Sequence, residues 1–302
     1  MPEKRFLTYD QQIELLKSKN LQIENEDTAK KYLARFGYYS LVSGYKDMFK
    51  QERNGNYRAD ASFSKLVSLY FFDDYLKNKL LHELIRVEKH IRSLYSYSFC
   101  DVFGDNQTDY LNVNNYNYQR YQSDVNTFIS KIQDILSHSE NYPYIHYNIS
   151  TYGTVPLWVL IQSITFGSLS KMYMFSYQHL QSQVSRNFDC IYPNHLCKML
   201  NIMSKFRNVC AHGERLYNFK TRNSILDLPI HNNIENYNPN SKNDVFNLLI
   251  CFKYLSAGYD FVTLIQSIDE MIDTTKPFLG DYYTSKLLSS MGFPENWKDI
   301  TK

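Results

Sequence analysis

The longest uninterrupted apolar periodicity in the chain covers residues 62–99, and it restricts the fold more than any other feature. Apolar residues recur there at steps of three and four, and neither glycine nor proline interrupts them. Steps of this size place side chains on one face of an α-helix. The apolar positions are Leu66, Leu69, Phe72, Leu76, Leu80, Leu84, Val87, Ile91, Leu94 and Tyr95. The segment therefore predicts a helix of roughly ten turns.

The rest of the chain repeats the helical pattern over shorter stretches. Thr8 and Gln11 form a capping box for a first short helix, whereas Asp27 is expected to cap a second helix that Gly37 ends. Further helices are expected at about 123–138, from Pro156 with a break at Gly167, from Asn194 to Ala211, and at about 243–272. Loops are expected at 101–121, through Pro143 and Gly153, and at 219–241.

Strand-like alternation is scarce, so the predicted fold class is all-α. We expect residues 1–60 to form a short helical appendage packed on a main helical domain of residues 61–302. The two short helices near the start resemble a helix-turn-helix DNA reader in outline. The long linker at 18–26 and the few base-reading side chains on the second helix disfavour that interpretation.

Composition restricts the location and the partners. The net charge of +2 is too small to indicate nucleic-acid binding by itself, so phosphates would have to meet a local basic patch. The 27 tyrosines and 19 phenylalanines suit cores and base-stacking surfaces alike, and Trp158 is assigned to the core. The five cysteines form no CxxC pair, and no window reaches the length of a membrane span. We therefore expect a cytoplasmic protein without a membrane partner.

The segment that carries chemistry reads HLCKMLNIMSKFRNVCAHGERLYN, over residues 195–218. On a helical wheel its apolar residues gather on one side, while Asn208 and His212 share the other side. Arg207 falls at the edge of the apolar arc, where a guanidinium is costly without a partner. The expected partner is Glu88 on the long helix, in preference to Glu83, and the pair would hold the guanidinium in place before any ligand binds.

The stretch Arg207-Asn208-Val209-Cys210-Ala211-His212 is similar to the R-x4-6-H motif of HEPN ribonucleases. Its extended form RNVCAHGERLYN resembles the closing block of the abortive-infection (Abi, AbiD/AbiF-like) family of bacterial phage-defence proteins. The blocks LTYDQQIELLKSKNLQI, YYSLVSGY and PLWVLIQSITFGSLSKMY agree in order, so the resemblance spans about residues 5–220.

The resemblance implies a HEPN-like helical bundle, an endoribonuclease activity and a homodimer whose motifs meet across a symmetric cleft. Some family members are paired with a small non-coding RNA, and the family is regarded as related to RNA-guided type VI CRISPR nucleases. The catalytic residues would be Arg207, His212 and Asn208.

The residue types suit metal-independent RNA cleavage that leaves 2′,3′-cyclic phosphate ends. A histidine can move protons near neutrality, an arginine grips phosphate oxygens, and Asn208 can hold the imidazole or donate to phosphate. No cofactor or metal is expected, because the histidines other than His90 and His212 show no metal-ligand spacing: His82, His138, His146, His179, His195 and His231. The residues expected to bind RNA near the motif are Lys205, Arg215, Tyr217 and Lys220, with Arg222 and Phe219 beside them.

Simpler interpretations stay open at this point. A histidine near a helix end, such as His212, often only contacts free carbonyls. Glu88 and Arg92 form an i, i+4 pair, so the segment 86–92 can also be interpreted as a bridging or solvated helix face. Two functions remain. The chain is either an endoribonuclease acting on cellular RNA, or a non-catalytic RNA-binding, dimerising protein held in complex with a small non-coding RNA.

Overall fold

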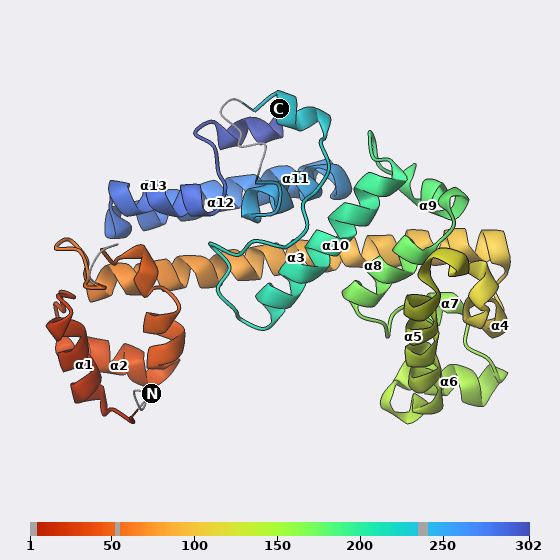
Figure 1. Ribbon diagram of the computed structural model, residues 1–302, viewed down its shortest axis with the longest axis horizontal. Helices are drawn as coiled ribbons and strands as arrows, with labels where there is room; N and C mark the ends of the chain where they lie inside the picture. The colour runs from red at the N-terminus through yellow and green to blue at the C-terminus, as the bar shows by residue number, and fades with distance from the viewer. Residues whose placement is uncertain (1–4, 52–54, 235–240) are drawn as a thin grey trace.

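The computed structural model describes residues 5–51, 55–234 and 241–302. The chain is 71% helical, and within the described residues only two isolated β-bridges occur and no strand. The predicted all-α class is confirmed. One long helix runs through the whole length of the molecule, and the other helices pack along it and at its two ends (Figure 1).

That helix is α3, Phe63–Phe103, which follows the predicted segment and extends a little beyond it. Ser62 caps its start by accepting a hydrogen bond from the Lys65 amide at 3.3 Å, which satisfies one of the free donors of the first turn. Gly104 ends the helix with a φ of +101°, a conformation that suits glycine.

The N-terminal segment lies at one end of α3 (Figure 1) and contains α1, Tyr9–Ser18, and α2, Glu26–Phe36, followed by the π-helix η1, Tyr39–Ser43, and the 3₁₀ helix η2, Lys46–Met48. The capping box of Thr8 and Gln11 is present as predicted. The predicted cap of α2 is wrong: the Asn25 side chain accepts from the Thr28 amide at 2.8 Å, so Asp27 lies inside the first turn.

The other end of α3 is covered by helices that the sequence had indicated only in part. They are α4, Gln107–Leu111; the 3₁₀ helix η3, Val113–Asn115; α5, Tyr118–Ser137; the 3₁₀ helix η4, Ser139–Asn141; α6, Pro143–Tyr152; and α7, Leu157–Leu160. The loops expected at 101–121 and through 143–153 are therefore partly helical. Pro143 begins α6 at its first turn, where its missing N–H costs nothing. Trp158 was expected in the core, but it is 50% exposed.

Three later helices pack against α3: α8, Phe166–Phe175; α9, Gln178–Ser185; and α10, Pro193–Ala211. The break predicted in this segment occurs earlier than Gly167, between Leu160 of α7 and Phe166 of α8, so Gly167 lies in the first turn of α8 and Thr165 caps that helix. The predicted cap of α10 is wrong. Tyr192 is the residue before the helix, and Pro193 occupies its first turn, so Asn194 is already helical.

The C-terminal part contains the 3₁₀ helix η5, Pro229–Asn232; α11, Val245–Leu255; α12, Gly258–Leu279; α13, Asp281–Ser290; and the 3₁₀ helix η6, Trp297–Thr301. The single helix predicted at 243–272 is thus two helices, since Ser256 and Ala257 adopt extended backbone between them. Most of the loop predicted at 219–241 is described and contains η5, whereas its residues 235–240 lie outside the described residues.

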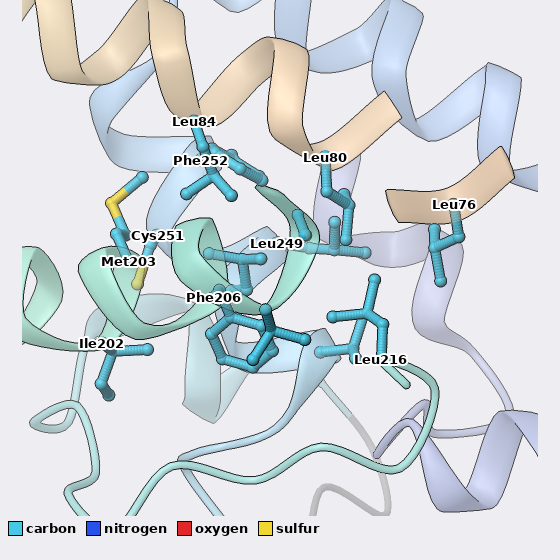
Figure 2. Packing of buried hydrophobic residues seen from close by; sticks show 14 of the residues in the cluster. Leu76, Leu80, Leu84, Ile202, Met203, Phe206, Leu216, Leu249, Cys251 and Phe252 are labelled. Carbon is cyan, nitrogen blue, oxygen red and sulfur yellow. The ribbon is translucent and has the colours of Figure 1, made fainter. Parts of the chain in front are cut away.

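The core forms where α10 crosses α3 and α11 packs beside both (Figure 2). Leu80 and Leu84 of α3 face Phe206 of α10 and Phe252 of α11, and all four side chains are buried. The helix α12 runs along another side of α3 (Figure 1). This packing fixes the motif helix α10 against the middle of α3. Among the described helices, none combines the length and the apolar character needed to cross a membrane.

Candidate active site

The motif helix α10 ends at the residue that the sequence indicated. His212 is its C-cap, and its amide donates to the Asn208 carbonyl at 2.9 Å. Gly213 follows with a φ of +66°, which glycine adopts without the steric cost of a Cβ, and the Glu214 amide returns to the Val209 carbonyl at 3.0 Å. The backbone of His212 is therefore held on both sides, while its side chain is exposed.

Arg207 makes the contact that was expected of it. Its Nε atom lies 3.6 Å from Oε2 of Glu88, whose side chain is only 6% exposed. The Arg207 side chain is 37% exposed as a whole, whereas its Nε atom is buried and has no hydrogen-bond partner. The separation is that of an ion pair and is too long for a hydrogen bond. Glu83 instead lies 3.9 Å from Arg86.

Glu88 is shared with a second arginine on the same helix. Arg92 donates from Nη2 to Oε1 of Glu88, as the i, i+4 spacing predicted. Arg92 also donates to the carbonyls of Ile164 at 2.7 Å and Gln162 at 3.2 Å. Burial lowers the pKa of Arg92, because desolvation disfavours its charged form, and the nearby Arg207 charge acts in the same direction. One buried carboxylate thus balances two guanidinium groups.

A second buried carboxylate, Asp73 of α3, holds the loop after His212. Its Oδ1 accepts from the Tyr217 amide at 2.6 Å, and its Oδ2 accepts from the Leu216 amide at 3.1 Å and from the Tyr45 hydroxyl at 2.7 Å. Asp73 is fully buried, and this burial raises its pKa. Asp73 was not among the residues predicted for the site, although a carboxylate within the apolar stripe of residues 62–99 was a usable signal.

Lys77, one turn further along α3, completes this anchor. Its side chain is 6% exposed, and its Nζ lies 3.9 Å from the Asp73 carboxylate and 3.5 Å from the Asp74 carboxylate. It also donates to the Gly213 carbonyl at 3.5 Å. The loop that begins at Gly213 is thus tied to α3 by a buried acid and a buried base.

The residues expected to bind RNA fall into two groups. Lys205 and Lys220 are exposed, although Lys220 also donates to Ser241 at 3.3 Å, and the catalytic candidate Asn208 beside them is exposed as well. Arg215 is half-buried.

Tyr217 was expected to stack on bases, and the structure excludes this use of its ring in the observed fold. Its side chain is 2% exposed and stacks on Tyr45, with ring centroids 5.9 Å apart. Burial raises the pKa of Tyr217 to about 12, so its hydroxyl stays protonated. The ring is part of the core that fixes the loop.

No three side chains of His, Cys, Asp or Glu in the described ranges lie together as metal ligands would. The site defined so far is a helix end on an all-α scaffold. An arginine anchored by a buried carboxylate precedes an exposed histidine, and exposed basic residues lie beside them in the sequence.

Comparison with known proteins places this architecture in a family. The family model described as Abi-like protein matches residues 31–218, which include the second half of α2, the whole of α3 and α10, and the start of the loop after α10. The chain belongs to the Abi-like family, and this membership indicates a role in abortive-infection phage defence. Searches of curated proteins and of solved structures gave no match.

Proposed function

We propose that the protein is a metal-independent endoribonuclease of the HEPN type, acting in abortive-infection defence or as an RNA-regulated toxin. The observation that carries the proposal is the pairing of a positioned arginine with an exposed histidine at the end of α10. Arg207 is held by the buried Glu88, while His212 at the helix terminus keeps an exposed ring on a fixed backbone. Catalysis by charge stabilisation requires groups that are positioned before the substrate arrives.

The chemistry assigns one task to each side chain. The ribose 2′-oxygen attacks the adjacent phosphorus, the bond from phosphorus to the 5′-oxygen breaks, and the products carry a 2′,3′-cyclic phosphate and a 5′-hydroxyl. His212 takes the proton from the 2′-hydroxyl or gives one to the leaving 5′-oxygen. Arg207 stabilises the negative charge that grows on the phosphate oxygens, and Asn208 donates to the phosphate or orients the imidazole.

The same chemistry supports a homodimer. Two proton transfers occur in the reaction, and the motif offers one histidine per chain. A second chain related by a two-fold axis would bring a second His212 to the same phosphate. The proposed partners are therefore a second copy of the chain, the RNA substrate and a cognate small non-coding RNA that controls the activity.

The test is cleavage of a fluorescent RNA by purified protein in EDTA. His212→Ala and Arg207→Ala should each lower the rate by on the order of 10²–10⁴, while His82→Ala, an exposed histidine of α3, serves as the matched control. The 3′ ends of the products should resist phosphatase until the cyclic phosphate is opened. Full activity of His212→Ala would contradict the proposal. Tight RNA binding by the wild-type protein without any cleavage would instead support the alternative of a non-catalytic RNA-binding protein.

A further inference from the structure

A cleft of about 730 Å³ lies between the N-terminal segment and the loop after His212. Its walls come from the end of α2, from η1 and the residues after it, from Tyr70 of α3 and from residues 213–215. The motif loop therefore supplies one wall, and this wall begins at the residue after His212. A volume of this size is in the range of small-molecule sites and is large enough for a nucleotide.

The two walls of the cleft are held together by direct contacts between their residues. Arg215 donates from Nη1 to the Gly44 carbonyl and lies 3.9 Å from the Asp47 carboxylate, while Tyr45 stacks on Tyr217. Position 44 requires glycine because the backbone approaches closely there: a Cβ at Gly44 would lie 2.8 Å from the Ser40 carbonyl oxygen. The sequence blocks YYSLVSGY and RNVCAHGERLYN thus meet in space and form the cleft together.

The lining has the chemistry of a nucleotide site. Two guanidinium groups, of Arg35 and Arg215, face it together with a single carboxylate, of Glu214. Arg35 has no carboxylate partner within the described part of the chain. The Tyr39 ring also lines the cleft and is 80% exposed, and none of the described aromatic rings stacks on it. Tyr39 begins η1, a π-helix, and such helices are frequent at functional sites.

We propose that this cleft binds an unpaired nucleotide of the RNA next to the scissile phosphate. The base stacks on Tyr39, while Arg35 and Arg215 contact the flanking phosphates. A base can stack on a side chain only when it is unstacked from its neighbours, so the preferred substrate is single-stranded RNA or a loop rather than a duplex. This inference rests on the proposed function, because that function makes the neighbouring phosphate the one that is cleaved. The RNA binding that it predicts can nevertheless be measured without cleavage.

The experiment measures fluorescence anisotropy of a labelled, unstructured RNA of about ten nucleotides, titrated with full-length His212→Ala protein. Tyr39→Ala should weaken binding about tenfold, the usual effect of losing one stacked base, and Tyr39→Phe should bind within about twofold of the parent. Arg35→Ala should also weaken binding and lower the salt dependence by about 0.7, the value for one phosphate contact on a single strand. The controls are Tyr259→Ala and Arg186→Ala, which change exposed residues outside the cleft.

A loss confined to Tyr39→Ala and Arg35→Ala, and to single-stranded RNA, would support the inference. It would be overturned if these variants bound single-stranded RNA as tightly as the controls, or if Tyr39→Ala weakened binding to a blunt RNA duplex equally. It would also be overturned if the parent bound no RNA and instead captured a protein through this cleft. These outcomes are separate from the cleavage test, because the proposed function fails when His212→Ala cleaves RNA normally, whatever Tyr39 does.

Discussion

Glu88 is the residue whose replacement tests the architecture of the site most directly. Glu88→Ala removes the one carboxylate that Arg92 and Arg207 share. The side chains of Glu88 and Arg92 are 6% and 14% exposed, so both are largely withdrawn from water, whereas Arg207 is 37% exposed. The variant would leave two cations close together without their counter-charge.

The size of the effect follows from these exposures. Removing one member of a buried ion pair costs about 3–5 kcal/mol, because the other charge stays buried. Arg92 keeps its two carbonyl acceptors, and water screens the loss at Arg207, so we expect the lower end, about 3 kcal/mol. At about 2 °C per kcal/mol for a chain of this size, the melting temperature should fall by about 6 °C.

The assay is thermal and urea unfolding of wild type, Glu88→Ala and the control Glu83→Ala. Glu83 lies on the same helix and is as buried, but its contact is a single exposed arginine, Arg86, at 3.9 Å, so its loss should be clearly smaller. Glu88→Gln keeps the shape and removes the charge. Glu88→Gln should lower the rate of RNA cleavage by about tenfold, because the guanidinium of Arg207 would no longer be held in position. Equal stability of Glu88→Ala and Glu83→Ala, or cleavage by Glu88→Gln as fast as by wild type, would refute this role of Glu88.

Two further predictions concern the assembly and the second buried carboxylate. Mixing His212→Ala chains with wild type should depress cleavage more than dilution alone, because mixed dimers lack one proton-transfer group; a monomer with full activity at nanomolar concentration would exclude this. Asp73→Asn should destabilise the fold by about 1–3 kcal/mol in urea titrations, since the amide offers one acceptor oxygen where the carboxylate serves three donors. Wild-type stability of Asp73→Asn would show that these hydrogen bonds matter little.

The parts of the fold that could be predicted from the sequence are those with a long period or a local signal. The helix α3 is long enough to show its apolar stripe over many turns, and Gly213 marks the end of α10 because a positive φ favours glycine. The pairing of Arg207 with Glu88 could be predicted from the sequence for a related reason. A cation at the margin of an apolar face needs an acceptor, and the long helix offered few candidates.

The rest depended on contacts between distant segments. Helices such as α4 and α7 have one turn or little more, which is too short for a period to emerge. The break between α11 and α12 contains no proline, and Gly258 follows it only as the first helical residue, so the apolar pattern reads as continuous. Tyr217 lies in a loop that looks solvated in sequence, yet packing on Tyr45 buries it. Tyr45 and Tyr217 are far apart in the sequence, so no local pattern could predict their contact.

The two buried carboxylates of α3 explain why one long helix suits this site. Asp73 and Glu88 are fifteen residues apart, about four turns and roughly 22 Å, so they project from nearly the same face of the helix. Glu88 pairs with Arg207 before the end of α10, and Asp73 binds the backbone that follows it at Leu216 and Tyr217. The segment that contains His212 is thus fixed at both ends to one rigid element while its ring stays free. The proton-transfer role proposed for His212 needs this combination, because the scaffold must set the position of the group and the imidazole must remain open to the proposed RNA substrate.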